Sequence, residues 1–112
     1  MISRLYIEDV LESCHRIEQY TEGMTFSKFV KDNLVYDAVL RNIEVIGEAV
    51  KQIPPEIRNH HPEIDWRRIA GMRDIVAHHY FSIYDEIVWD IVKNKIPVLK
   101  EQMNQILKEI RS

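Results

Sequence analysis

The chain has 112 residues and a formal net charge of −3, because 15 Lys and Arg side chains face 18 Asp and Glu side chains. This length allows one domain, which we expect to span residues 1–112, and the acidic balance argues against a protein that coats nucleic acid with a broad basic surface. A single cysteine excludes an intrachain disulfide framework. The sequence shows neither a signal peptide nor the ~18 uninterrupted apolar residues of a membrane span. We therefore expect a cytoplasmic protein without membrane contact.

The first half of the chain has the apolar spacing of amphipathic helices. Residues 3–22 are predicted to form the first helix. A second helical segment runs from about residue 25 to 53, and Asp32-Asn33 is expected to divide it into a short helix and a long one. Gly47 lies near the apolar face of this segment, where the missing side chain would let another helix approach closely. The stripe of the first helix comprises Ile7, Val10, Leu11, Cys14 and Ile17.

A third helix is predicted after the prolines at 54–55, which stop the second segment because neither can donate a helical hydrogen bond. Residues 56–64 are interpreted as a turn of helix and a loop. Asp65 is a candidate N-cap for a helix from Trp66 to about His78. One face of that helix carries Trp66, Ile69, Ala70, Arg73 and Ala77.

A long last helix is predicted to follow Ser82. Ser82 to Asp85 fits the capping-box pattern, with Asp85 at the third helical position, and Pro97 should kink the helix. No alternating strand pattern occurs, so we predict an all-α, up-and-down bundle of four to five helices. The apolar face of the last helix carries Ile87, Ile91, Leu99, Met103, Ile106 and Ile110.

Charge is unevenly distributed along the chain. Residues 1–56 contain 6 basic and 10 acidic side chains, whereas residues 57–112 contain 9 and 8. An acidic protein with one stretch dense in arginine and histidine suggests a local anion site; the alternative is a solvated helix face with ordinary surface histidines. That stretch contains Arg58, His60, His61, Arg67, Arg68, Arg73, His78 and His79.

The most informative short pattern runs from Arg73 to Tyr80. An arginine on an apolar stripe is costly to bury unless it is paired, so Arg73 should face either a structural carboxylate or a functional anion. His78 lies about 140° further around an ideal helix, so the two could border one cleft if the helix ends near His78. A neutralised phosphate beside a proton-transfer group is what phosphodiester cleavage requires.

Other chemical constellations are weaker. The histidine pairs at 60–61 and 78–79 could ligate a metal, but adjacent helical residues point about 100° apart and no HExxH spacing occurs. Glu12 and His15 match half of a di-iron motif whose other members are missing. We interpret Cys14, Trp66 and Trp89 as packed residues rather than as a nucleophile and base-stacking platforms.

The Arg-x4-His-x-Tyr pattern of Arg73, His78 and Tyr80 resembles the motif of the HEPN superfamily, specifically its HepT-like toxin branch. The resemblance covers nearly the whole chain and includes residues 41–49 and 62–74. Asp74, the polar residue after the motif arginine, also fits. The chain departs from the pattern at residues 82–84, where Ser-Ile-Tyr stands in place of Gly, a β-branched residue and Asp.

This resemblance implies a HEPN-like fold and a metal-independent endoribonuclease toxin. It implies a homodimer that brings two motifs to one cleft, and a minimal nucleotidyltransferase (MNT) antitoxin that attaches AMP to Tyr80. Arg73 would hold the phosphate of an RNA substrate (tRNA or mRNA), His78 would transfer protons, and Asp74 would orient Arg73 or a motif residue of the other subunit. The chain itself would need no cofactor, since ATP and Mg²⁺ belong to the partner. The second hypothesis is a non-catalytic helical accessory subunit of the nucleotidyltransferase.

Overall fold

The structure is a computed structural model that describes residues 2–77 and 84–111 of the chain. Within those ranges it contains helices and no strand, so the predicted all-α class is confirmed. The helices are α1 (Ile2–Thr21), α2 (Phe26–Lys31), α3 (Asn33–Lys51), α4 (Pro55–His60), α5 (Trp66–Gly71), α6 (Arg73–Ala77), α7 (Asp85–Asp90), the π-helical η2 (Ile91–Lys95) and α8 (Ile96–Arg111).

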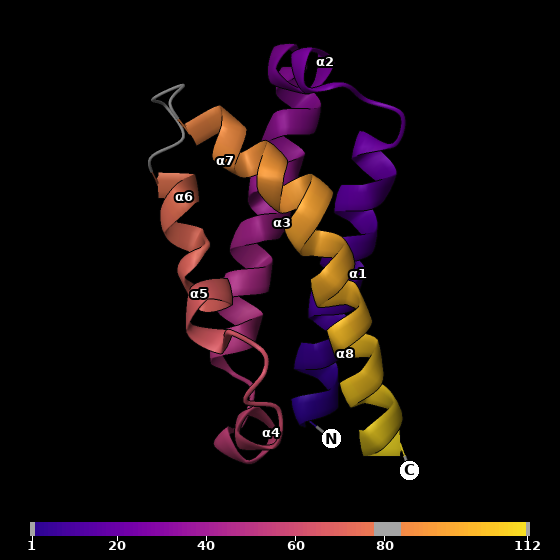
Figure 1. Cartoon of the computed structure of the whole chain (residues 1–112), viewed down its shortest axis with the longest axis vertical. Coiled ribbons are helices and arrows are strands. Elements are labelled where there is room, and N and C mark those ends of the chain that lie inside the picture. Colours follow the sequence, from indigo (N-terminus) through magenta and orange to yellow (C-terminus); the bar gives the residue numbers. More distant parts are fainter. Residues whose placement is uncertain (1, 78–83, 112) are drawn as a thin grey trace.

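The long helical segments run up and down in turn along an elongated bundle (Figure 1). Helix α1 packs against both α3 and α8, while α5 and α6 follow one another along α3. The described chain begins and ends at the same end of the bundle, as expected for four alternating segments. The bundle measures 43 × 25 × 22 Å.

The core is concentrated between α1, α3 and α8. Helices α4, α5 and α6 contribute no fully buried residue of their own. The segment carrying Arg73 is therefore an outer layer that leans on α3, and its residues are partly exposed. Fully buried core residues include Ile7, Val10, Cys14, Ile17, Val39, Ile43, Ile46, Ile96, Met103 and Ile106.

The predicted break at Asp32 is confirmed. Asp32 ends α2 and caps α3, because its side chain accepts a hydrogen bond from the Val35 N–H at 3.1 Å. Thr25 caps α2 in the same way, by accepting from the Lys28 N–H at 3.2 Å. Each cap satisfies an N–H group that has no partner within its helix.

The predicted continuous helix from Trp66 to His78 was wrong in one respect, since it is interrupted at Met72. Asp65 caps α5 as predicted, accepting from the Arg68 N–H at 3.1 Å. Met72 then closes a tighter turn by donating to the Ile69 carbonyl at 3.1 Å, and its side chain is buried. Burial of Met72 in the core sets the start of α6 at Arg73.

The last helix begins differently from the prediction. Asp85 is the first residue of α7, not the third, and its carboxylate accepts a hydrogen bond from the Tyr36 hydroxyl at 2.5 Å. Ile87, predicted for the apolar face, is 45% exposed, whereas Ile91 is buried. The proposed capping residue Ser82 lies outside the described residues.

The effect of Pro97 appears in the turn before it. Pro97 has no N–H, and in a regular helix its ring would clash with the carbonyl four residues earlier. The preceding turn widens into η2, where the Ile96 N–H donates to the Ile91 carbonyl, five residues back. The chain from Asp85 to Arg111 thus stays helical while α7 leans away from the line of α8 (Figure 1).

Candidate functional site

Gly47 sets how closely the segment with Arg73 approaches α3. A Cβ atom at Gly47 would lie 3.1 Å from the Ala70 carbonyl oxygen and 3.3 Å from the Arg73 Cβ. Both distances are shorter than ordinary carbon contacts, so a side chain at this position would push α5 and α6 outward. The predicted close approach of another helix at Gly47 is confirmed, and the approaching residues are Ala70 and Arg73.

Arg73 is paired with a carboxylate of α3. Its Nη1 atom lies 2.7 Å from Oε1 of Glu48, and the two side chains are 39% and 49% exposed. The expectation of a buried arginine was therefore wrong, because α6 belongs to the outer layer. Arg73 was expected to face either a structural carboxylate or a functional anion, and the structure shows the carboxylate of Glu48.

Sequence reasoning missed Glu48. Gly47 could have pointed to it, because the residue that follows a glycine in a helix–helix contact lies at the edge of that contact. Glu48 also borders a groove of about 390 Å³ between α1 and α3. This groove is acidic on balance, since its charged residues are Asp9, Arg41, Glu44 and Glu48.

Only part of the predicted catalytic motif falls within the described residues. Arg73 and Asp74 are the first two residues of α6, and Asp74 is exposed. His78 and Tyr80 lie outside the described residues, as does His79. The joint placement of Arg73 and His78, and the roles assigned to them, thus stay predictions.

The stretch dense in arginine does not form one cluster. Arg73 pairs with Glu48, Arg58 and Arg67 line a common pocket at the end of α3, and Arg68 lines a pocket between α5 and α8. The described arginines of the stretch therefore do not form the single anion site expected from composition, and His78 and His79 of the same stretch lie outside the described residues. Two pockets are each lined by two of these arginines: Arg58 and Arg67 line one, and Arg67 and Arg68 line another.

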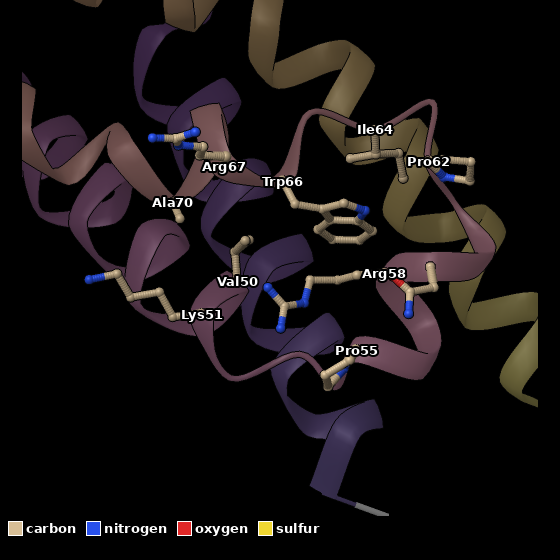
Figure 2. Close-up of a pocket in the computed structure, with 10 residues that line it drawn as sticks. Val50, Lys51, Pro55, Arg58, Pro62, Ile64, Trp66, Arg67 and Ala70 are labelled. Atoms are coloured by element: carbon tan, nitrogen blue, oxygen red, sulfur yellow. The ribbon is translucent and has the colours of Figure 1, made fainter.

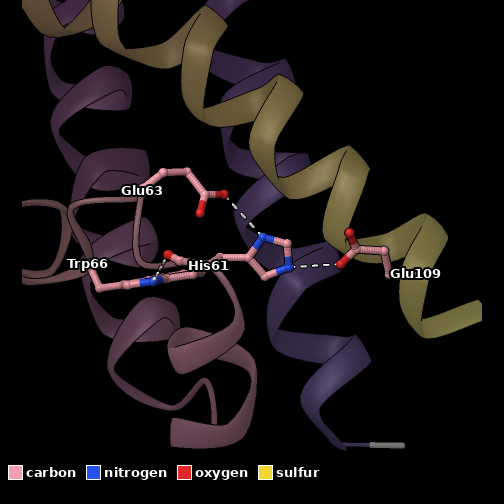
Figure 3. A network of polar contacts seen from close by, with 4 residues as sticks. All are labelled: His61, Glu63, Trp66 and Glu109. Carbon is pink, nitrogen blue, oxygen red and sulfur yellow. Dashed lines mark hydrogen bonds and ion pairs between the residues drawn. The ribbon is translucent and has the colours of Figure 1, made fainter.

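His61 joins the loop before α5 to the end of α8 (Figure 3). Its Nε2 lies 2.7 Å from Glu109 and its Nδ1 lies 3.2 Å from Glu63. The Glu63 carboxyl has a lowered pKa, first because its own backbone N–H donates to it and then because of the His61 ring. The His61 carbonyl accepts from the Trp66 indole N–H at 3.0 Å, so this histidine serves as a structural link.

The remaining candidates behave as packed residues. Cys14 is buried, and burial raises the pKa of its thiol to about 12, so it is no nucleophile at neutral pH. Trp89 packs on the Phe29 ring, with centroids 5.1 Å apart. Trp66 is only partly buried: it contacts the core and also lines the pocket of Arg58 and Arg67.

Two kinds of site are missing from the part of the chain that the structure covers. In residues 2–77 and 84–111, no three His, Cys, Asp or Glu side chains are grouped so that they could hold a metal ion. Within the same ranges, every helix is too short or too polar to cross a membrane.

The chain is similar to known ribonuclease-family proteins over almost its whole length. The family model described as "Ribonuclease HepT-like" matches residues 10–106. A protein of Methanocaldococcus jannaschii named a "putative RNase" is 44% identical over 107 residues, which cover 96% of this chain and 88% of the relative. A protein of Thermococcus cleftensis named "Probable ribonuclease HepT" is 41% identical over 103 residues, or 92% of this chain and 94% of the relative. No solved structure matches the chain significantly.

Proposed function

The chain belongs to the HepT-like ribonuclease family, and we propose that it is a toxin that cleaves RNA without a metal ion. The observation that carries this proposal is the family match over residues 10–106, which includes the whole Arg73–Tyr80 motif. The structure supports it by placing Arg73 on an accessible outer layer of the bundle, where a large substrate can reach the guanidinium.

The proposed reaction uses the ribose 2′-hydroxyl as the nucleophile. His78 takes the 2′-hydroxyl proton or gives a proton to the leaving 5′-oxygen, and Arg73 stabilises the charge that grows on the phosphate oxygens. The products are a 2′,3′-cyclic phosphate and a free 5′-hydroxyl, so no metal-activated water is required. Asp74, next to Arg73, acts as an orienting group.

The ion pair with Glu48 is compatible with a phosphate-binding role for Arg73. A guanidinium has five N–H donors in a planar fork, and the contact to Glu48 engages one of its nitrogens. Glu48 fixes the direction of the side chain, while the other donors remain oriented for a phosphate. We therefore assign Glu48 as a positioning residue for Arg73.

The proposed active unit is a homodimer. Arg73 and His78 are about 140° apart on an ideal helix, so a cleft shared by two subunits could combine the arginine of one motif with the histidine of the other. The proposed inhibitor is an MNT-type nucleotidyltransferase that transfers AMP from ATP to Tyr80. The added phosphate charge and bulk, two residues from His78, would block the cleft.

Inducible expression of the wild type beside Arg73→Ala and His78→Ala tests the toxin. We expect growth arrest by the wild type but by neither of these two variants, and we expect the wild type to cleave RNA in EDTA and leave 2′,3′-cyclic phosphate ends. Loss of the half-exposed Arg73–Glu48 pair should cost at most about 1 kcal/mol of stability, so Arg73→Ala should remain folded. Arg68→Ala, an exposed arginine outside the motif, is the matched control and should remain toxic.

Equal cleavage by His78→Ala would refute the mechanism. A wild type that forms a stable nucleotidyltransferase complex but neither cleaves RNA nor arrests growth would instead support the accessory-subunit hypothesis. Mass spectrometry after incubation with the partner, ATP and Mg²⁺ tests the modification separately. The expected result is an increment of ~329 Da on Tyr80, and an unmodified Tyr80 in an inhibited complex would mean inhibition by binding alone.

A further inference from the structure

A basic pocket lies at the end of α3, one helical turn beyond Glu48. It is a pocket of about 670 Å³ enclosed by the end of α3, α4 and the start of α5 (Figure 2). Ala70, three residues before Arg73, forms part of its wall, so the pocket opens beside the segment that carries the motif arginine. Its charged residues are Lys51, Arg58 and Arg67, and no acidic side chain lines it.

The three cations are unneutralised within the described part of the chain. The ion pairs found there involve other residues, so Lys51, Arg58 and Arg67 line the pocket without a carboxylate within 4.0 Å of any of them. Arg58 extends into the pocket from α4, as Figure 2 shows, and its Nε atom is buried without a hydrogen-bond partner. A buried donor without an acceptor is costly, so this guanidinium is not fully satisfied by the protein, and an anionic ligand in the pocket would bind it through its terminal Nη atoms.

Trp66 adds an aromatic wall to this basic pocket. Its indole N–H donates to the His61 carbonyl at 3.0 Å, which fixes the ring in place, and Figure 2 shows the ring beside the Arg58 side chain. Val50 and Ile64 complete the apolar part of the lining. Cations that can hold a phosphate next to a fixed aromatic ring are the combination that binds nucleotides of single-stranded nucleic acid.

We propose that this pocket binds one nucleotide of the RNA substrate outside the cleavage site. Arg58 holds its phosphate and the base rests against Trp66, whereas Lys51 and Arg67, whose charged ends point away from Arg58 in Figure 2, each contact a neighbouring phosphate of the strand. A single phosphate ion would leave most of the 670 Å³ unfilled, whereas a nucleotide uses both the charged and the aromatic walls. This inference rests on the proposed ribonuclease function, because it assigns a second contact for the same substrate.

Binding of an uncleavable RNA tests the cations. The probe is a labelled ten-nucleotide RNA of mixed sequence with 2′-O-methyl groups, which lacks the attacking hydroxyl. We expect Lys51→Gln/Arg67→Gln to weaken binding about tenfold at 0.1 M salt and to lower the salt slope by about 1.4, since each single-strand phosphate contact contributes roughly 0.7. The control Lys28→Gln/Arg68→Gln removes the same charge outside the pocket and should leave affinity and slope near the wild-type values.

Fluorescence tests the aromatic wall directly. In Trp89→Phe, Trp66 is the remaining tryptophan, and saturating probe should quench its emission. In Trp66→Phe, the emission of Trp89 should stay unchanged. Quenching of Trp89 instead of Trp66 would overturn the assignment of the base to this pocket.

Failure of the pocket proposal can be distinguished from failure of the ribonuclease proposal. A wild type that cleaves RNA, but whose probe affinity is the same in both double variants, keeps the ribonuclease and refutes the pocket. Pocket-dependent binding by a wild type that cleaves no RNA keeps the pocket and refutes the ribonuclease. Absence of probe binding to the wild type refutes the nucleotide pocket. If inorganic phosphate quenches the emission of Trp66 as fully as the probe does, the pocket is a simple anion site and not a nucleotide site.

Discussion

The substitution Gly47→Ala should displace the segment that carries Arg73 while leaving the Arg73 side chain itself unaltered. The new Cβ would lie 3.1 Å from the Ala70 carbonyl oxygen. A backbone oxygen cannot rotate away as a side-chain end does, so α5 and α6 must move outward by a few tenths of an ångström. Overpacking of this kind costs about 1–3 kcal/mol. Alanine regains about 0.5–1 kcal/mol of helix propensity, which leaves a net loss of roughly 0–2.5 kcal/mol.

Gly71 provides the matched control. It is also helical, but a Cβ there would meet nothing within 4 Å, so Gly71→Ala should gain the propensity term alone, about 0.5–1 kcal/mol. The two variants should therefore differ by the overpacking cost, about 1–3 kcal/mol. For a domain of this length, that corresponds to thermal midpoints about 4–12 °C apart.

Thermal unfolding followed by circular dichroism measures this difference, and cleavage of RNA below both transitions measures its effect on the site. We expect Gly47→Ala to lower kcat several-fold, because small displacements of a positioned group reduce catalysis steeply, and Gly71→Ala to leave it unchanged. A Gly47→Ala protein that unfolds at or above the midpoint of Gly71→Ala would refute the close seating of α5 and α6 on α3.

Three further predictions concern other residues. Tyr36→Phe removes the hydroxyl bond to Asp85 and should cost about 1.5 kcal/mol in urea unfolding, and an unchanged midpoint would contradict a stabilising bond. Cys14, with its pKa raised to about 12 by burial, should resist a thiol reagent at pH 8 until guanidinium unfolds the chain, whereas rapid labelling of the folded protein would exclude that burial. Glu63 has a lowered pKa in the folded protein, first because its own backbone N–H donates to it and then because of His61, so its contribution to stability is present above its ordinary value of 4.5 and is lost as the pH falls. The difference in thermal midpoint between wild type and Glu63→Gln should be larger at pH 7 than at pH 3, and a constant difference would contradict the lowered pKa.

The sequence by itself determined the helical class and most helix boundaries. Asp32 and Asp65 carry local information, because a cap acts on N–H groups two or three residues away. Pro97 also acts locally, because it removes one hydrogen-bond donor from its own helix. The close helix contact at Gly47 was also predictable from the sequence, since a missing side chain on an apolar face lets another helix approach.

Only the tertiary structure decided what each of these residues faces. The pairing of Arg73 with Glu48, the break at Met72 and the pocket that Arg58 and Arg67 both line depend on how separate segments pack. Helical periodicity records which side of a helix is apolar but not which helix lies opposite or at what distance. The stretch dense in arginine was visible in the sequence despite the acidic total of −3, but the pocket itself was not, because its walls form only where α4 and α5 pack beside the end of α3.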